Sequence, residues 1–210
     1  MATRLGEVFE DRGLVARIKD RLPRLFQMAE MECSRAGKTG MQVGSLREII
    51  LVAMLIYKFG EENVETGIPI TRPEVDAMLF GLPVSIKTIT GRRFGGVKLV
   101  WTVDPQKARE FAEGYHPHCD ILLTQINWGY AGVLCHIPLE VQQRHFERLG
   151  QKTYIRLPKP GTNPRGVEID KEAMAAMAAD ADTKGVTVIW HRMDVRHNAY
   201  EKWIDLWRED

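Results

Sequence analysis

An aspartate and a lysine in the middle of the chain are spaced so that they can act together. Alternating apolar residues predict two strands, over residues 74–80 and 84–90, joined by a tight Gly-Leu-Pro turn. Asp76 lies on the first strand and Lys87, eleven residues later, on the second, where it shares a face with Ser85. A hairpin would bring the Asp76 carboxylate beside the Lys87 ammonium. In a metal-dependent phosphodiesterase such a carboxylate holds Mg²⁺, which polarises the scissile phosphate, and the ammonium steadies the attacking hydroxide.

One carboxylate is a sparse site for Mg²⁺, so a second acid is expected nearby. Glu48 precedes Asp76 by 28 residues and lies in the first turn of a helix predicted over residues 45–59, whose apolar surface must pack on the sheet. The alternative is a capping box, in which Glu48 accepts a hydrogen bond from the Ser45 amide. For Asp76 the alternative is a structural ion pair with Lys87 that needs no metal.

The order Glu48, Asp76 and then Ser85-Ile86-Lys87 resembles the active site of the PD-(D/E)XK nuclease superfamily. The resemblance implies that Glu48 and Asp76 bind Mg²⁺ and that Lys87 positions the nucleophile. It further implies that the Ile86 carbonyl completes the inner coordination shell. Two features depart from the motif: no proline directly precedes Asp76, and Ser85 stands where the second acid is usual. The duty of that acid would pass to Glu48, a migration to a helix that several members of the superfamily show.

The closer likeness, over residues 41–87, is to the ThaI family of type II restriction endonucleases, which cut CGCG to blunt ends. It rests on the spacing of the three active-site residues and on Met41, seven residues before the glutamate in a Gly-rich loop predicted at 37–44. The likeness implies a homodimer on double-stranded DNA, with Met41 of each subunit pushed into the base stack and Gln42 beside it. CG steps unstack easily, and an unbranched methionine makes a suitable wedge. A companion DNA methyltransferase is a further implied partner.

Basic residues gather in two stretches, although the net charge is only +1. Because bulk basicity is absent, any affinity for nucleic acid must come from charge placement. Placement in loops suits phosphate contact, and the alternative is an ordinary solvated surface. The predicted phosphate contacts are Arg92 and Arg93 on a hairpin loop, and Lys159 and Arg165 on a Pro/Gly-rich loop.

A competing site of softer ligands is conceivable. His116, His118 and Cys119 lie on one segment and Cys135-His136 on another, so a zinc ion could be held between them. The spacing matches no compact zinc pattern, and adjacent residues of a strand face opposite sides. We therefore favour buried cysteines and a core histidine.

The elements that must position these residues follow from periodicity. Residues 4–36 have apolar positions at helical spacing, with breaks predicted at Gly13 and Pro23. The remaining predicted elements are a third strand of the hairpin sheet at 97–103, a helix from Asp104-Pro105 to Gly114, strands at 120–127 and 131–137, a helix at 138–149, a short strand at 152–157, a loop at 159–166, a helix at 170–181, a strand at 186–190 and a helix at 199–207.

Length and composition fit one domain. The chain has 210 residues, 44% of them hydrophobic and 27% charged, which excludes a disordered or coiled-coil protein. We expect an α+β (mixed α/β) fold with a restriction-endonuclease-like core, in which a helical N-terminal part precedes a mostly antiparallel central sheet flanked by helices. Within it we expect a helical part with a DNA-contacting loop (1–44), a catalytic core (45–137) and C-terminal helices, strands and DNA-binding loops (138–210).

Membrane and secreted classes are disfavoured. The longest charge-free apolar run has nine residues, 49–57, against roughly twenty needed to cross a bilayer. The N-terminus carries charges where a signal peptide needs an apolar stretch, so we expect a cytoplasmic protein. The three cysteines, which include Cys33, form no secreted-type disulfide framework.

These observations predict a type II restriction endonuclease that hydrolyses phosphodiester bonds of double-stranded DNA with Mg²⁺ at a short palindrome. A palindrome requires two identical sites, so a homodimer follows from symmetry. The first alternative is a repair or recombination nuclease with the same metal site and no sequence preference. The second is a non-catalytic DNA-binding module in which Glu48 caps a helix and Asp76 pairs with Lys87. Only the enzymes would depend on Mg²⁺.

Overall fold

The computed structural model describes residues 3–35, 41–69, 72–158, 166–196, 198 and 200–209. The helices are α1 (Glu7–Glu10), α2 (Arg12–Arg35), α3 (Met41–Phe59), α4 (Pro105–Gly114), α5 (Leu139–Leu149), α6 (Gln151–Tyr154), α7 (Lys171–Ala178) and α8 (Glu201–Arg208), with 3-10 turns η1 (Arg4–Gly6) and η2 (Glu61–Asn63). The strands are β1 (Val64–Glu65), β2 (Ala77–Leu79), β3 (Leu82–Thr90), β4 (Val97–Val100), β5 (Asp120–Ile126), β6 (Ala131–Ile137), β7 (Ile155–Arg156), β8 (Val167–Ile169) and β9 (Lys184–Ile189).

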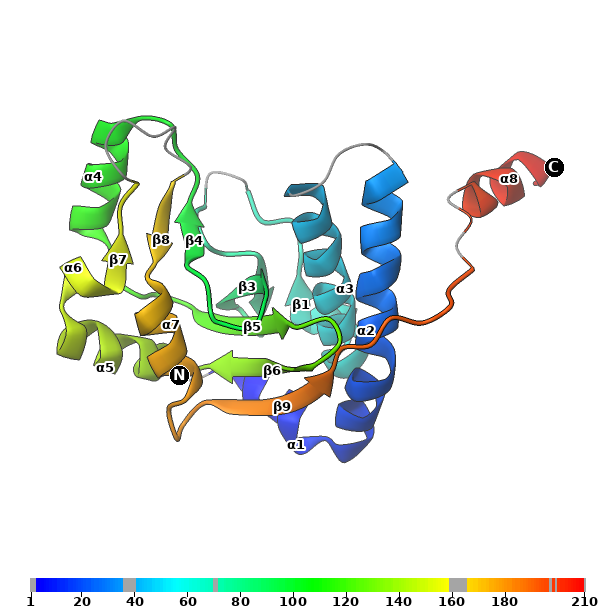
Figure 1. Ribbon diagram of the computed structural model, residues 1–210, viewed down its shortest axis with the longest axis horizontal. Helices are drawn as coiled ribbons and strands as arrows, with labels where there is room; N and C mark the ends of the chain where they lie inside the picture. Colours follow the sequence, from blue (N-terminus) through cyan, green and yellow to red (C-terminus); the bar gives the residue numbers. More distant parts are fainter. Residues whose placement is uncertain are drawn as a thin grey trace.

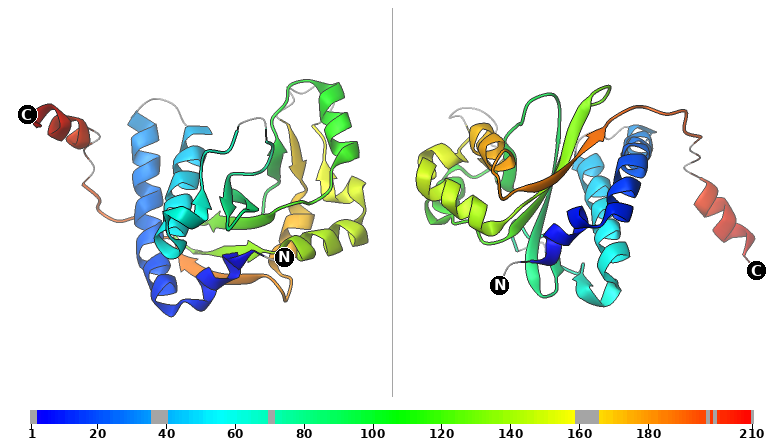
Figure 2. Two further views of the ribbon diagram at one scale, coloured as in Figure 1. Left: turned by 180° about the vertical axis from the view of Figure 1, so that it is seen from behind. Right: turned by 90° about the horizontal axis from the view of Figure 1, so that it is seen from below.

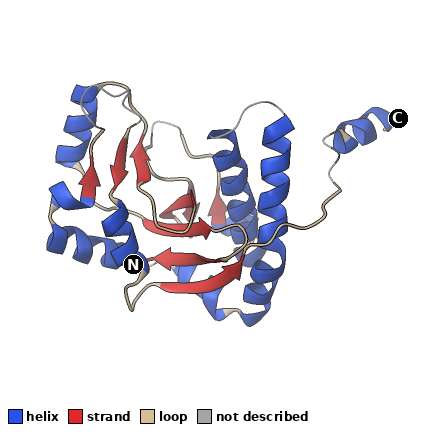
Figure 3. Ribbon diagram, viewed as in Figure 1, coloured by secondary structure: helices blue, strands red, loops and turns tan. Residues whose placement is uncertain are grey.

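A six-stranded sheet forms the centre of the molecule, in the order β1-β2-β3-β5-β6-β9. Every neighbouring pair in it is antiparallel except β3 and β5, which run parallel. A smaller antiparallel sheet has the order β4-β8-β7. Helices flank the strands on both sides (Figures 1 and 3). The predicted mixed fold with a mostly antiparallel central sheet is therefore confirmed.

Two hydrophobic cores lie on the two faces of the central sheet. Side chains of a strand alternate between faces, and β5 shows the consequence. Its Leu122 and Ile126 pack in a core with α1, α2 and α3, whereas its Ile121 and Leu123 pack in a core with α4–α7 and the small sheet. Figure 2 shows the two helical layers on opposite sides of the strands. This layering presses α3 against the sheet beside β3.

The N-terminal helices differ from the predicted ones at their breaks. The chain breaks at Asp11, whose Oδ1 accepts a hydrogen bond from the Leu14 amide at 3.0 Å and so caps the start of α2. The break predicted at Pro23 is wrong, because α2 continues through this residue. A proline removes one backbone hydrogen bond, but Leu22 and Phe26 on either side of it are buried in the core. Tertiary packing holds the helix together there.

Helix α3 begins earlier than predicted, at Met41. The predicted loop is therefore wrong for residues 41–44, and the predicted boundary between residues 44 and 45 falls inside α3. A single glycine costs a helix only about 1 kcal/mol, which burial of residues such as Leu51 outweighs. Ser45 is the fifth residue of α3 and does not occupy an N-cap position. The capping-box interpretation of Glu48 is therefore wrong.

Two strand predictions also fail. β4 does not extend the hairpin sheet but pairs with β8, while β3 pairs with β5. The turn after β3 carries the chain away from the central sheet, and Val97 and Leu99 are buried in the second core. Residues 152–154 belong to α6, so only the end of the strand predicted at 152–157 forms. Among the described helices, none has both the length and the hydropathy needed to cross a membrane.

Candidate active site

The tight turn between β2 and β3 fixes the register of the site. Ala77 pairs with Val84 and Leu79 with Leu82, so the turn consists of Phe80 and Gly81. Both turn residues have positive φ, 50° and 75°, as a two-residue hairpin turn of the primed type requires. Asp76 directly precedes β2, and its amide donates to the Val84 carbonyl at 2.9 Å. The Asp76 side chain consequently lies opposite residues 85–87.

One oxygen of Asp76 collects three donors from β3. Asp76 Oδ2 accepts hydrogen bonds from the Ile86 amide at 2.6 Å, from Lys87 Nζ at 3.2 Å and from Ser85 Oγ at 3.4 Å. The side chains of Asp76 and Lys87 are 19% and 15% exposed, so both reach solvent. The structure thus brings together the aspartate and the lysine, as their spacing in the sequence predicts. The backbone of β3 fixes the orientation of the Asp76 carboxylate.

Glu48 joins this pair from α3. It lies between two hollows: one of about 710 Å³ that Asp76 and Lys87 also line, and one of about 340 Å³ lined also by Ile86 and Lys98. Glu48 is half-buried, and this burial raises the pKa of its carboxyl group. The neighbouring Asp76 raises that pKa further, whereas Lys87 lowers it. Glu48 and Asp76, which line the same hollow, therefore repel each other.

A third acid, Glu74, lies at the same site and escaped the sequence analysis. It is buried, and burial raises the pKa of its carboxyl group to about 7; Lys87 and a hydrogen bond from Tyr115 act in the opposite direction. The Tyr115 hydroxyl donates to Glu74 Oε2 at 3.3 Å, but Glu74 Oε1 has no hydrogen-bond partner among the described residues. Three carboxyl groups and one lysine are thus crowded together, an arrangement that a divalent cation would neutralise.

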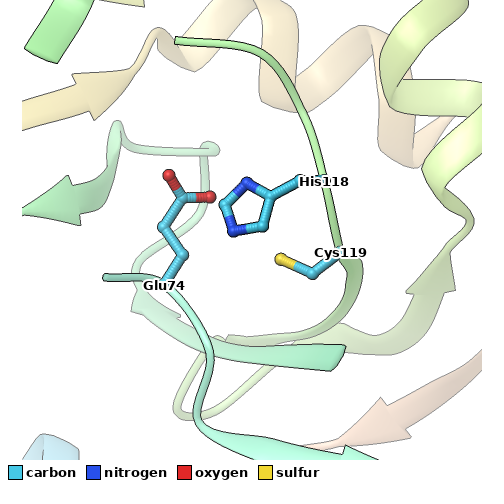
Figure 4. Close-up of side chains that lie close together, drawn as sticks. All are labelled: Glu74, His118 and Cys119. Atoms are coloured by element: carbon cyan, nitrogen blue, oxygen red, sulfur yellow. The ribbon is translucent and has the colours of Figure 1, made fainter. Parts of the chain in front are cut away.

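Figure 4 shows a group of possible metal ligands at the edge of this site. One ligand atom each of Glu74, His118 and Cys119 lies within 4.8 Å of the others. Thiol and imidazole are softer ligands than Mg²⁺ prefers, and burial raises the pKa of the Cys119 thiol to about 12. This group therefore does not replace Glu48 and Asp76 as a site for a hard cation.

Cys135 and His136, the second segment of the alternative zinc site, have other contacts in the structure. His136 Nε2 lies 2.7 Å from Asp120 Oδ2, and Cys135, its neighbour on β6, packs in the second core. The two residues face opposite sides of the strand, as predicted. All three cysteines of the chain are free and buried.

The residues predicted to contact DNA are only partly described. Arg92 and Arg93 are exposed in the turn after β3, and the Arg92 guanidinium lies 4.2 Å from the centre of the Tyr130 ring. Gln42 is exposed in the first turn of α3. Met41 opens α3, but its side chain is not among those described. Lys159 and Arg165 lie outside the described residues.

Three charged residues at the site were not predicted from the sequence. Lys98 and Glu168 face each other across β4 and β8 and line the smaller hollow. They were missed because β4 was assigned to the wrong sheet. For Glu74 a signal existed: it precedes Asp76 by two residues, the spacing of residues on one face of a strand.

Two comparisons with known proteins find restriction endonucleases. The family model described as "Restriction endonuclease ThaI" matches residues 8–209. A solved structure described as "Restriction endonuclease in complex with substrate DNA" is 53% identical, covers 98% of this chain and 99% of that chain, and superposes with a TM-score of 0.90. No curated protein sequence matches the chain.

Proposed function

The chain belongs to the ThaI restriction endonuclease family, and from this premise we propose that it cuts double-stranded DNA at CGCG to blunt ends with Mg²⁺. As a member of the family it is a type II restriction enzyme, a site-specific endodeoxyribonuclease. The observation that carries the proposal is the Asp76 carboxylate, held by the Ile86 amide with Lys87 and Glu48 around it. We propose that this is a site of the PD-(D/E)XK type.

The donor set fits a hard divalent cation. We assign Glu48 and Asp76 as ligands, because both line the larger hollow and carboxylate oxygens suit Mg²⁺. The Ile86 carbonyl is the third oxygen ligand that we propose, since the amide and carbonyl of a strand residue point to the same edge and the Ile86 amide reaches Asp76. When bound, Mg²⁺ would polarise the scissile phosphate and lower the pKa of a bound water.

The other residues of the site have roles that their contacts suggest. The Ile86 amide and the Ser85 hydroxyl both donate to Oδ2 of Asp76 and so hold the carboxylate in one orientation. Lys87, at 3.2 Å from Asp76, is placed to steady the attacking hydroxide and the negative charge that develops on the phosphate. Partial burial of both side chains strengthens these electrostatic effects.

Recognition of DNA begins on the helix that carries Glu48. Positions 41 and 48 are two turns apart on α3, about 10 Å along the axis, and lie on the same side of the helix. A wedge at Met41, with Gln42 beside it, would thus be rigidly linked to a metal ligand. Phosphate contacts are assigned to Arg92, Arg93, Lys159 and Arg165. A palindromic target implies a homodimer, and protection of host DNA implies a companion methyltransferase.

The test is digestion of a plasmid of known sequence with the purified protein in Mg²⁺ and in EDTA, followed by run-off sequencing of the ends. We expect blunt ends within CGCG in Mg²⁺ and no cleavage in EDTA. A plasmid whose CGCG sites have been removed by mutation serves as the control and should stay intact. Ends at other sequences would contradict the assigned target, and cleavage in EDTA would contradict the metal.

The Met41 assignment needs its own variant. Met41→Ala should lose discrimination between CGCG and sequences that differ at one CG step, because the wedge that senses unstacking is gone. Ile49→Ala, which removes an apolar side chain that is 60% exposed on the same helix, provides the matched control. An unchanged preference in Met41→Ala would contradict the wedge and leave the active-site assignment intact.

A further inference from the structure

The C-terminal segment leaves the body of the protein as an arm. Its last described anchors are on α2, where Gln27 exchanges two hydrogen bonds of 2.8 Å with the Met193 backbone and Glu30 pairs with Arg192 at 2.8 Å. Beyond them the chain carries α8 out into solvent, away from the other helices in all the views of Figures 1 and 2. The described side chains of this eight-residue helix are all exposed, so they gain little from packing within their own chain.

The side chains of α8 are unusually apolar for such an exposed helix. Ile204 is 40% exposed, Leu206 46% and Trp207 88%. A helix this short is not stable in water by itself, so its apolar side chains need a surface to pack against.

A matching surface exists on the outer face of α2 and α3. It is a groove of about 310 Å³ whose walls are almost entirely apolar. Leu25 and Tyr57, which line it, are 38% and 63% exposed. The residues that contribute apolar surface are Leu14, Ile18, Leu22, Leu25, Ile50, Ala53, Met54 and Tyr57.

Length and charge match between helix and groove. The groove runs along α2 from residue 14 to residue 25, about 17 Å, and α8 is about 12 Å long. Arg17 and Arg21 border the groove, whereas residues 201–210 hold four acids and two bases. Glu201, one turn before Ile204, lies at the border of the apolar face of α8. The same negative charge disfavours DNA phosphate as the partner of this helix.

The α2–α3 groove and the point where the arm of the same chain is anchored lie on opposite sides of α2. Glu30, which anchors the arm, follows Arg21 by nine residues, about two and a half turns, and so lies on the opposite side of the helix. Figure 1 shows α3 on one side of α2 and the arm on the other. To reach its own groove the arm would have to wrap around α2.

We propose that α8 of one protomer packs in the α2–α3 groove of a second copy, and that the two copies exchange arms about a twofold axis. This inference rests on the homodimer of the proposed function and names its interface. Exchange of identical elements satisfies both copies at once. It also clamps α3, the helix that carries Glu48, so assembly of the dimer would steady one of the proposed metal ligands.

Sedimentation of the full-length protein over a concentration series tests the interface. Trp207→Ala should raise the dimer dissociation constant at least about 10-fold, because an aromatic anchor in an apolar pocket dominates such contacts. Ile189→Ala removes a side chain that is 56% exposed on β9 and should leave the constant unchanged. Equal dissociation constants for Trp207→Ala and the wild-type protein would overturn the proposal.

Cross-linking decides which copy the arm occupies. The native cysteines are buried, so Ala53→Cys in the groove and Arg208→Cys on the arm, where Trp207 is kept, introduce the two accessible thiols. With a short bis-maleimide we expect a covalent product of twice the chain mass in the double variant and none in either single variant. A product that keeps the mass of one chain would place α8 in its own groove, and absence of a product would place it elsewhere. Either outcome overturns the exchange of arms. The proposed Mg²⁺-dependent cleavage is tested separately, on the wild-type protein, and does not depend on this result.

Discussion

The carboxylate of Asp120 and those of Glu48 and Glu74 are all withdrawn from solvent at least in part, but their surroundings affect them in opposite ways. Asp120, at the start of β5, has both oxygens occupied: Thr3 Oγ1 and His136 Nε2 contact Oδ2, and the Leu139 amide donates to Oδ1 at 2.8 Å. Burial by itself would raise the pKa of Asp120, but these hydrogen bonds outweigh it and hold the pKa below its usual value. At Glu48 and Glu74, burial prevails and the pKa is raised.

The difference separates a structural carboxylate from a functional one. Fixed donors around Asp120 stabilise the folded chain and leave little capacity for a ligand. Glu48 and Glu74 instead line a hollow together with Asp76, and among the described residues Glu74 Oε1 has no donor that compensates for its burial. Carboxylates held in this way cost stability in the free protein, and a bound cation would recover it.

Apart from Asp76, the largest effect is expected at Lys87. Lys87→Ala should lower the rate of a single DNA-cleavage turnover by about 10²–10⁴-fold, the usual contribution of a positioned proton-transfer or charge-stabilising group. Binding to a DNA duplex in Ca²⁺, followed by fluorescence anisotropy, should change little. A cleavage rate within a few-fold of the wild-type rate would remove Lys87 from the reaction.

Glu48→Gln should separate activity from stability. Loss of a metal ligand is expected to slow cleavage by about 10²-fold or more. In EDTA, however, Tm should be no lower than that of the wild type, because the change removes repulsion with Asp76 and the cost of burying a charge. The rise of Tm on addition of Mg²⁺ should disappear. A clear fall of Tm in EDTA would assign Glu48 a structural role.

Asp120→Asn should show the reverse pattern. We expect a loss of about 1–3 kcal/mol in the free energy of unfolding, because buried donors lose an ionised acceptor, with no change in the cleavage rate. The pKa of Asp120 is lowered on folding, so its ionisation stabilises the protein above the pKa of the unfolded chain and stops doing so as pH falls through the folded pKa. Urea denaturation at neutral and at acidic pH should show the variant's deficit shrinking in acid.

The smallest effects are expected at the surface arginines. Arg92→Ala and Arg93→Ala should each weaken DNA binding a few-fold at all sequences and reduce the slope of log K against log salt by about 1. Arg92, which is held against Tyr130, should have the larger effect. Arg144→Ala is the matched control, since that guanidinium pairs with Asp180 and Asp182. A slope equal to that of the control would exclude a phosphate contact.

Local chemistry made the hairpin and α4 predictable. The alternation around Gly81 predicts the hairpin that pairs Asp76 with Lys87, although its turn consists of Phe80 and Gly81 and the predicted Gly-Leu-Pro turn is wrong. Asp104 caps α4, as predicted, by accepting from the Gln106 amide at 2.8 Å. Both features depend on residues within about a dozen positions of each other. Sequence periodicity carries such information directly.

Contacts between distant segments were not predictable in the same way. Glu74 is paired with Tyr115, 41 residues away, and Asp120 with Thr3, 117 residues away. The partner of β4 and the start of α3 depend on which apolar faces the whole chain buries. The local sequence pattern indicates that Glu48 lies in a helix. Only the packing of α3 on β3 brings Glu48 beside Asp76.

The most direct test compares single-turnover cleavage of a CGCG duplex by Asp76→Asn and Asp120→Asn under identical Mg²⁺ conditions. Each variant is first shown to be folded and to bind the duplex. We predict that Asp76→Asn loses at least about 10³-fold in rate, while Asp120→Asn, although less stable, cuts at the wild-type rate. An Asp76→Asn enzyme that cuts within about 10-fold of the wild type would contradict the assignment of the active site.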